Sequence, residues 1–293
     1  MLPDFPTNEV IAELNPLIIT SPTIRAGTTL LQRLLCSSPK ALIYGELCAQ
    51  DLEFYLNLYT FKVQEYNYHR QRFTNGIDRV LNREVNDWIP DLMPDIDGYL
   101  AAISQSAFAG ITYCRDYAAK AGRPVWGFKY PGWKPPMLRL IRMVMPKSRF
   151  IFIYRDVLDS LRSAKAQQVI NSVEEVHEFC QAWKEGLEYI LSLDSDPAML
   201  VLRYEGLVSA PKTTLKRIAE FSCVYDMDPT VLDRKINAWS GEGYLAQAKD
   251  GYTLPADLTE AEIQIANDTT SALRGRLYPD VTTRHSSVSL SLP

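Results

Sequence analysis

The sequence predicts an α/β fold with a central, mostly parallel sheet flanked by helices. Short apolar runs at 17–19, 149–154 and 199–203 are typical of buried strands. Between these runs apolar residues recur at helical spacing, and this alternation from 17 to 222 favours parallel pairing of the strands. We interpret the 293 residues as one domain with a helical insert at about 50–122 and a loose polar tail at about 281–293.

The first strand leads into a loop that is typical of anion binding. After the apolar run at 17–19, Pro22 and Gly27 mark a turn-rich segment, and leucines then recur at helical spacing over 30–35. The loop therefore points at a helix N-terminus, where free N–H groups and the helix dipole attract a phosphate. Arg25 adds positive charge to this loop, and Thr28 and Thr29 add hydroxyl donors.

The loop departs from a Walker A motif, GxxxxGK[ST], at two positions. When the motif is aligned on Gly27, it requires glycine at 22 and lysine at 28, where this chain has Pro22 and Thr28. The lysine that reaches the β- and γ-phosphates is therefore missing, which disfavours an ordinary ATPase or kinase.

The second predicted strand, 41–44, is followed by Gly45 and Glu46. A carboxylate at the end of a parallel strand is expected near the phosphate loop, because ligands gather at the carboxyl ends of such strands. The insert that follows is rich in aromatic and acidic residues, lacks strand-like runs, and contains His69. We expect several helices here, and if they line an acceptor pocket, their acidic character suits a cationic or polyhydroxyl acceptor.

Two later strands also end on basic residues. The strand at 125–129 ends at Lys129, where Pro131 stops the sheet, and the strongly β-forming run 149–154 ends at Arg155. Asp156 is a plausible N-cap for the next helix, which carries Ser163. Helices are also expected at about 136–145, 173–193 and 229–239, with a helix opened by Pro211 and one or two over 257–278.

Four segments, in this order, resemble the sulfotransferases that use 3′-phosphoadenosine 5′-phosphosulfate (PAPS). The segment Arg25-Ala26-Gly27-Thr28-Thr29 resembles their 5′-phosphosulfate loop, in the branch with arginine in that loop. Gly127-Phe128-Lys129 is similar to their strand-end lysine, and Arg155 with Ser163 resembles their 3′-phosphate-binding segment. The run 203–208, which contains Tyr204, resembles the strand and turn that follow in this superfamily.

The resemblance implies a P-loop-like sulfotransferase fold and transfer of a sulfuryl group from PAPS, without a metal. Nucleotide contacts are expected from Arg155, Ser163, Tyr204 and the loop residues 25–29, and charge stabilisation at the reacting group from Arg25 and Lys129. Glu46 is the expected base for the acceptor, because this branch tends to place a glutamate just after the first helix, and His69 is its rival. The C-terminal part of the nucleotide site is not recognisable.

The composition restricts which binding partners and which cellular compartment we expect. A net charge of −4 disfavours a general nucleic-acid binder, and no apolar stretch is long enough for a membrane span. Five scattered cysteines without CxxC spacing, and no visible secretion signal, favour reduced thiols in a cytoplasmic protein. We expect a small-molecule acceptor, such as a secondary metabolite with a hydroxyl or amine. A P-loop-type kinase and a non-catalytic nucleotide-binding protein remain the alternatives, and the oligomeric state is open.

Overall fold

The computed structural model describes residues 9–73, 76–84, 92–193, 196–236 and 256–279. Its centre is a five-stranded sheet in the order β2-β3-β1-β4-β5, in which all four pairings are parallel. The strands are β1 (Leu17–Thr20), β2 (Ala41–Tyr44), β3 (Val125–Lys129), β4 (Arg149–Tyr154) and β5 (Met199–Arg203). The predicted α/β class with a parallel sheet is confirmed.

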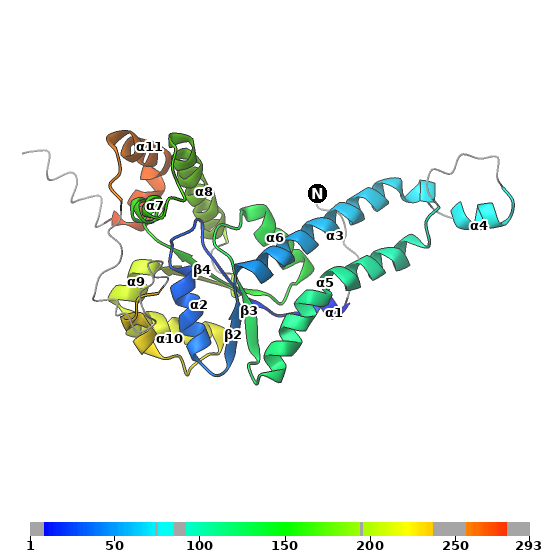
Figure 1. The fold of residues 1–293 in the computed structure, drawn as a ribbon, viewed down its shortest axis with the longest axis horizontal. Helices are drawn as coiled ribbons and strands as arrows, with labels where there is room; N and C mark the ends of the chain where they lie inside the picture. Colours follow the sequence, from blue (N-terminus) through cyan, green and yellow to red (C-terminus); the bar gives the residue numbers. More distant parts are fainter. Residues whose placement is uncertain (1–8, 74–75, 85–91, 194–195, 237–255, 280–293) are drawn as a thin grey trace, which may run out of the picture.

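Helices connect these strands and cover both faces of the sheet (Figure 1). In chain order they are α1 (Glu9–Ala12), α2 (Thr28–Ser37), α3 (Glu46–Phe73), α4 (Gly76–Leu81), α5 (Ile96–Lys120), α6 (Pro135–Val144), α7 (Val157–Ala166), α8 (Val173–Ser192), α9 (Tyr204–Ser209), α10 (Pro211–Ser222), the 3₁₀ helix η1 (Pro229–Asp233) and α11 (Glu260–Leu277).

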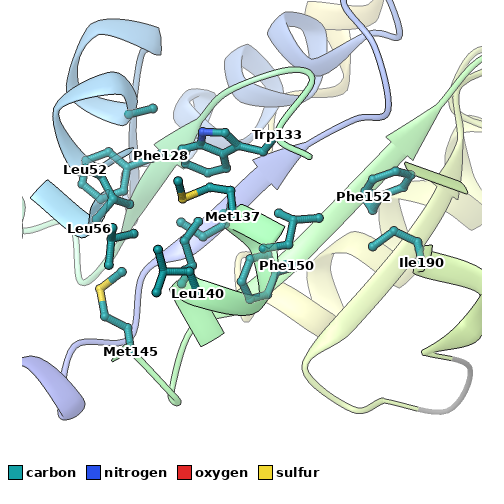
Figure 2. Close-up of a cluster of buried hydrophobic side chains, with 14 of the residues drawn as sticks. Leu52, Leu56, Phe128, Trp133, Met137, Leu140, Met145, Phe150, Phe152 and Ile190 are labelled. Atoms are coloured by element: carbon teal, nitrogen blue, oxygen red, sulfur yellow. The ribbon is translucent and has the colours of Figure 1, made fainter. Parts of the chain in front are cut away.

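The sheet separates two apolar cores because successive strand residues point to opposite faces. On β1, Ile18 faces one core and Leu17 and Ile19 face the other. The larger core lies between the sheet and helices that include α3, α5, α6 and α8, and Figure 2 shows part of it, with Leu52, Phe128, Trp133, Met137 and Phe150 packed together. The smaller core holds α2 and α10 against the other face. Both cores fix the strand ends where the candidate site residues lie.

The insert forms a helical hairpin that extends from the body of the molecule. Helices α3 and α5 run side by side away from the sheet, and α4 lies beyond their far ends (Figure 1). Their facing residues alternate at intervals of three and four: Leu52, Leu56, Tyr59 and Val63 on α3, and Leu100, Ser104, Ala107 and Ile111 on α5. This is the spacing of a coiled-coil seam. We call this hairpin, made of α3 and α5, the arm.

Several predicted boundaries need correction. The prediction places Glu46 at the end of a strand, whereas in the structure it is the first residue of α3. The insert therefore begins before the predicted residue 50. Of the helix expected over 229–239, residues 229–233 form the short 3₁₀ turn η1 and 237–239 lie outside the described residues. The turn expected after Arg203 is the helix α9. The segment 257–278 forms one helix, α11. The predicted tail at 281–293 lies outside the described residues.

Candidate functional site

The loop between β1 and α2 is built to present backbone donors. Arg25 has φ 66° and Gly27 has φ 99°, and these left-handed residues turn the chain into α2. Gly27 is the N-cap of α2 and supplies no side-chain hydrogen bond, and the first turn of this helix contains no acidic residue. The N–H groups of that turn, which begins at Thr28, are therefore suited to hold an anion. Ala26 is buried in the loop, and Thr29 is half-buried.

The structure brings the loop into contact with α7. The Arg25 Nε donates a hydrogen bond to Ser163 Oγ over 3.1 Å, although the two residues are 138 positions apart. Burial lowers the pKa of the Arg25 guanidinium, and the nearby charge of Arg155 lowers it further. The positive charges of Arg25 and Arg155 repel each other, and an anion between or beside them would stabilise both. The two predicted phosphate-binding segments therefore form one cationic site.

Arg155 follows the C-terminal end of β4 and is positioned by two aromatic residues. The Trp183 Nε1 on α8 donates a hydrogen bond of 2.9 Å to the Arg155 carbonyl oxygen. The Arg155 guanidinium carbon lies 4.9 Å from the centroid of the Tyr204 ring, a cation–π arrangement. Tyr204 begins α9 directly after β5, and its ring also closes against Gly27. The predicted nucleotide-binding residues thus lie together at the ends of β1, β4 and β5.

Lys129 and Glu46 form an ion pair on the β3 side of the site. Lys129 is the last residue of β3, pairs in register with Ile19 of β1, and is buried. Its Nζ contacts Glu46 Oε1 at the start of α3, and about half of the Glu46 side chain is exposed. The structure therefore joins the two predicted catalytic groups, with the carboxylate open to a ligand.

His69 lies far from this ion pair. Both His69 and Glu46 belong to α3, and they are 23 positions apart (69 − 46). At 1.5 Å per residue their backbones are about 35 Å apart along the helix. Within one copy of the chain, the structure therefore separates the two residues predicted as rival bases.

Sequence reasoning missed several residues that support the site. Asp156 caps α7 through the Leu158 N–H, as predicted, but it also forms an unpredicted buried ion pair, 2.7 Å long, with Arg274 of α11. The Trp133 Nε1 donates a hydrogen bond of 3.0 Å to Glu53 Oε2, which fixes the loop after β3 against α3. No local pattern could have revealed these pairs, because their partners are 118 and 80 positions apart.

Comparison with known proteins identifies the family. A family model described as "Sulfotransferase family" matches residues 16–225, which is most of the chain and contains every site residue predicted from the sequence. The chain belongs to the sulfotransferase family. The predicted family is thereby confirmed, and this sulfotransferase carries the expected α/β fold. No curated protein sequence matches it.

Solved structures similar to this sulfotransferase include three from different sources. The sulfotransferase domain of the Synechococcus PCC 7002 olefin synthase is 19% identical, with a TM-score of 0.49, over 92% of this chain and 97% of that one. Sulfotransferase STF9 from Mycobacterium avium is 13% identical, with a TM-score of 0.43, over 89% and 76%. Retinol dehydratase, in a complex with retinol and PAP, is 14% identical, with a TM-score of 0.36, over 92% and 82%.

The described residues contain neither a membrane-spanning helix nor a cluster of metal-binding side chains. Among the helices in the described ranges, none has the length and apolarity to cross a membrane. The described His, Cys, Asp and Glu side chains form no group of three or more that could hold a metal ion.

Proposed function

We propose that this sulfotransferase takes PAPS as its donor and transfers the sulfuryl group to a hydroxyl or amine of a small-molecule acceptor. The observation that carries the proposal is the hydrogen bond from Arg25 to Ser163. It joins the loop that resembles a 5′-phosphosulfate site to the helix that resembles a 3′-phosphate site. A ligand with phosphate groups at both ends of one nucleoside matches this paired site.

The residues present fit such a donor. The first turn of α2, together with Arg25, offers N–H groups and a guanidinium to the 5′ end of the nucleotide. Arg155 and Ser163 offer a guanidinium and a hydroxyl to the 3′-phosphate. In the loop itself, the buried Thr23 Oγ1 has no hydrogen-bond partner among the described residues, so it is free to bond to the donor.

The chemistry that we assign to the ion pair follows from charge. Bound PAPS would supply the sulfuryl group and a phosphate leaving group. Lys129 and Arg25 are cations that would stabilise the negative charge that develops on the leaving oxygen. Glu46 would accept the proton of the acceptor, and its half-exposed carboxylate is accessible for that role.

Substitutions test the donor site. Arg155→Ala is expected to weaken PAP binding by about 2 kcal/mol, the order of a lost charged hydrogen bond, or roughly 30-fold in Kd. Ser163→Ala should weaken it less. Arg162→Ala on the same helix is the matched control, because Arg162 pairs with Asp159. Unchanged calorimetric affinity in Arg155→Ala, with Arg162→Ala behaving alike, would refute the 3′-phosphate assignment.

The same calorimetry addresses the kinase alternative. Thr28 occupies the position of the Walker lysine and begins α2. A sulfotransferase site should bind PAP without a metal, whereas a kinase site should prefer ATP with Mg²⁺. Stronger binding of ATP–Mg²⁺ than of PAP would overturn the choice of donor.

The base and the acceptor are tested together by an acceptor screen with PAPS, in which mass spectrometry detects the added SO₃. The screen should include amines and polyols, because acidic residues near the start of α3 favour cationic or polyhydroxyl compounds. On any acceptor found, Glu46→Gln is expected to lower kcat by roughly 10²–10⁴-fold. Near-normal turnover in Glu46→Gln, together with its loss in His69→Ala, would transfer the base role to His69.

A further inference from the structure

Helix α3 is apolar on two opposite faces. One face forms the seam against α5 described above. The other carries a second row of large apolar side chains, Leu47, Phe54, Leu58 and Phe61, which we call the outer stripe. A helix that packs on one side only is expected to be polar on the other, so this second row requires an explanation.

The outer stripe is regular and exposed. Leu47 is 79% exposed, Phe54 68%, Leu58 46% and Phe61 57%, and Tyr68 continues the row with 84%. Residues seven apart on a straight helix differ in direction by only about 20°. Leu47, Phe54 and Phe61 therefore lie on one side of α3, over about 20 Å of its length. Figure 1 shows α3 running along the arm, with α5 packed along it.

The size of the stripe suits a protein interface. At about 200 Å² for a fully exposed side chain of this size, its four residues expose on the order of 500 Å² of apolar surface. Contiguous apolar patches of this size on soluble monomers often mark interaction sites. A standard interface buries about 800 Å² on each partner, and about 65% of a homodimer interface is apolar. The outer stripe therefore provides the apolar share of one such interface.

The charges on α3 indicate which surface would cover it. Residues 46–57 contain three carboxylates and no basic residue, whereas 58–73 contain three basic residues and one acidic residue. Glu46, Glu53 and Arg70 have contacts with other segments of the same chain, so Asp51 and Lys62 provide the charge complementarity between copies. Two copies of α3 in antiparallel order place the acidic half of each against the basic half of the other. Parallel order would place like charges side by side.

We infer that the outer stripe is a homodimer interface, in which the α3 helices of two copies pack antiparallel about a twofold axis. Such an interface is self-complementary, so one stripe suffices for both partners. Phe54 of one copy lies level with Leu58 and Phe61 of the other, at the centre of the contact. Leu47, next to Glu46, lies level with Tyr66 in the outer half of the second α3, so each arm borders the catalytic side of the other copy.

Sedimentation velocity over a range of concentrations tests this inference. The unmodified chain is expected to be a dimer, and the double variant Phe54→Glu with Phe61→Glu a monomer. The dissociation constant should rise at least about 30-fold, as for the loss of interface hot spots. These side chains are exposed, so circular dichroism should show unchanged secondary structure, whereas the thermal midpoint should fall because the dimer no longer stabilises the folded chain. The matched control is Val208→Glu with Tyr225→Glu, which places two acids at exposed apolar positions outside the arm and should remain dimeric.

A charge swap tests the antiparallel order. Asp51 of one copy lies level with Lys62 of the other, so Asp51→Lys alone should weaken the dimer. Adding Lys62→Asp in the same chain should restore it. In a parallel pair, Asp51 would face Asp51 and Lys62 would face Lys62, so the swap could not restore what the single change removed. Weakening without restoration therefore overturns the antiparallel arrangement.

A monomeric unmodified chain at every concentration overturns the inference as a whole. Binding of that monomer to phosphatidylcholine vesicles, abolished by the Phe54→Glu and Phe61→Glu pair, would then assign the stripe to a lipid surface. None of these measurements depends on the donor or on turnover, so their outcome is independent of the proposed function.

Discussion

At the scale of single residues, the phosphate loop depends on the absence of a side chain at Gly27. This residue has φ 99°, which disfavours every L-amino acid with a Cβ. A Cβ built there would also lie 2.4 Å from the Tyr204 Cδ2, well inside van der Waals contact. Gly27 therefore allows the Tyr204 ring to close over the loop while that ring also supports Arg155.

Gly27→Ala is accordingly expected to destabilise the fold and to weaken PAP binding. The left-handed backbone should cost about 1–2 kcal/mol, and overlap with Tyr204 should add about 1–3 kcal/mol. Gly122→Ala is the matched control, because Gly122 has φ 72° but an added Cβ would meet nothing within 4 Å. Urea unfolding and calorimetry with PAP compare the two. If both variants lose the same stability and neither loses affinity for PAP, the close approach of Tyr204 to Gly27 does not contribute to PAP binding.

A second prediction concerns the Cys114 thiol in the arm. Burial raises its pKa to about 11, and the neighbouring Cys48 thiol contributes to the shift. Because only the thiolate is alkylated, the labelling rate of Cys114 should keep rising well above pH 9, where an ordinary thiol is already ionised. Mass spectrometry of iodoacetamide-labelled peptides measures this, with the exposed Cys223 as the internal reference. A rate for Cys114 that levels off below pH 9 would contradict the prediction.

At the scale of secondary-structure elements, the sequence predicts what is local. Strand β4 and the loop before α2 were predictable because β-branched runs, turn residues and helical spacing are each read within about ten positions. The start of α3 at Glu46 was not predictable, because only Gly45 separates strand β2 from this helix. The ion pair of Asp156 with Arg274 was not predictable either, since its partners approach only after the sheet has formed.

That ion pair links α11 to the helix that follows Arg155. Both partners are buried, so Arg274→Ala leaves the Asp156 carboxylate without its counter-charge. Breaking one side of a buried pair typically costs about 3–5 kcal/mol. We expect a loss of this order in urea unfolding, together with weaker PAP binding, because Asp156 caps α7 and directly follows Arg155.

Arg276→Ala is the matched control for this prediction. Arg276 lies two positions further along α11 and is exposed, so its removal should change stability by less than about 0.5 kcal/mol. Similar losses in the two variants would mean that the Asp156 contact contributes little, and that other contacts, such as the ion pair of Lys165 with Glu262, hold α11 to the body.

At the scale of the whole molecule, two parts are stabilised differently. The sheet is covered on both faces, and β1 and β4 lie at its centre with strands on either side. Among the described residues, contacts between α3 and α5 hold the far half of the arm, including the ion pair of Arg70 with Asp97, and its outer stripe is open in a single copy. Figure 1 shows this half of the arm extending well beyond the sheet. The site residues lie at the junction of these parts, because Glu46 begins the arm and Lys129 ends a central strand.

Hydrogen exchange should distinguish these two parts. Amides in β1 and β4 are expected to exchange only through global unfolding, whereas those in 58–73 of α3 should exchange through local opening at a lower free energy, since fewer buried contacts hold them. PAP should slow exchange in the loop before α2 and at the start of α7, and leave 58–73 unchanged. If the outer stripe pairs two copies, Phe54→Glu with Phe61→Glu should speed exchange in α3 while β1 and β4 keep their rates. Equal protection of α3 and the central strands in that monomeric variant would show instead that the seam with α5 stabilises the arm as firmly as two cores stabilise the sheet.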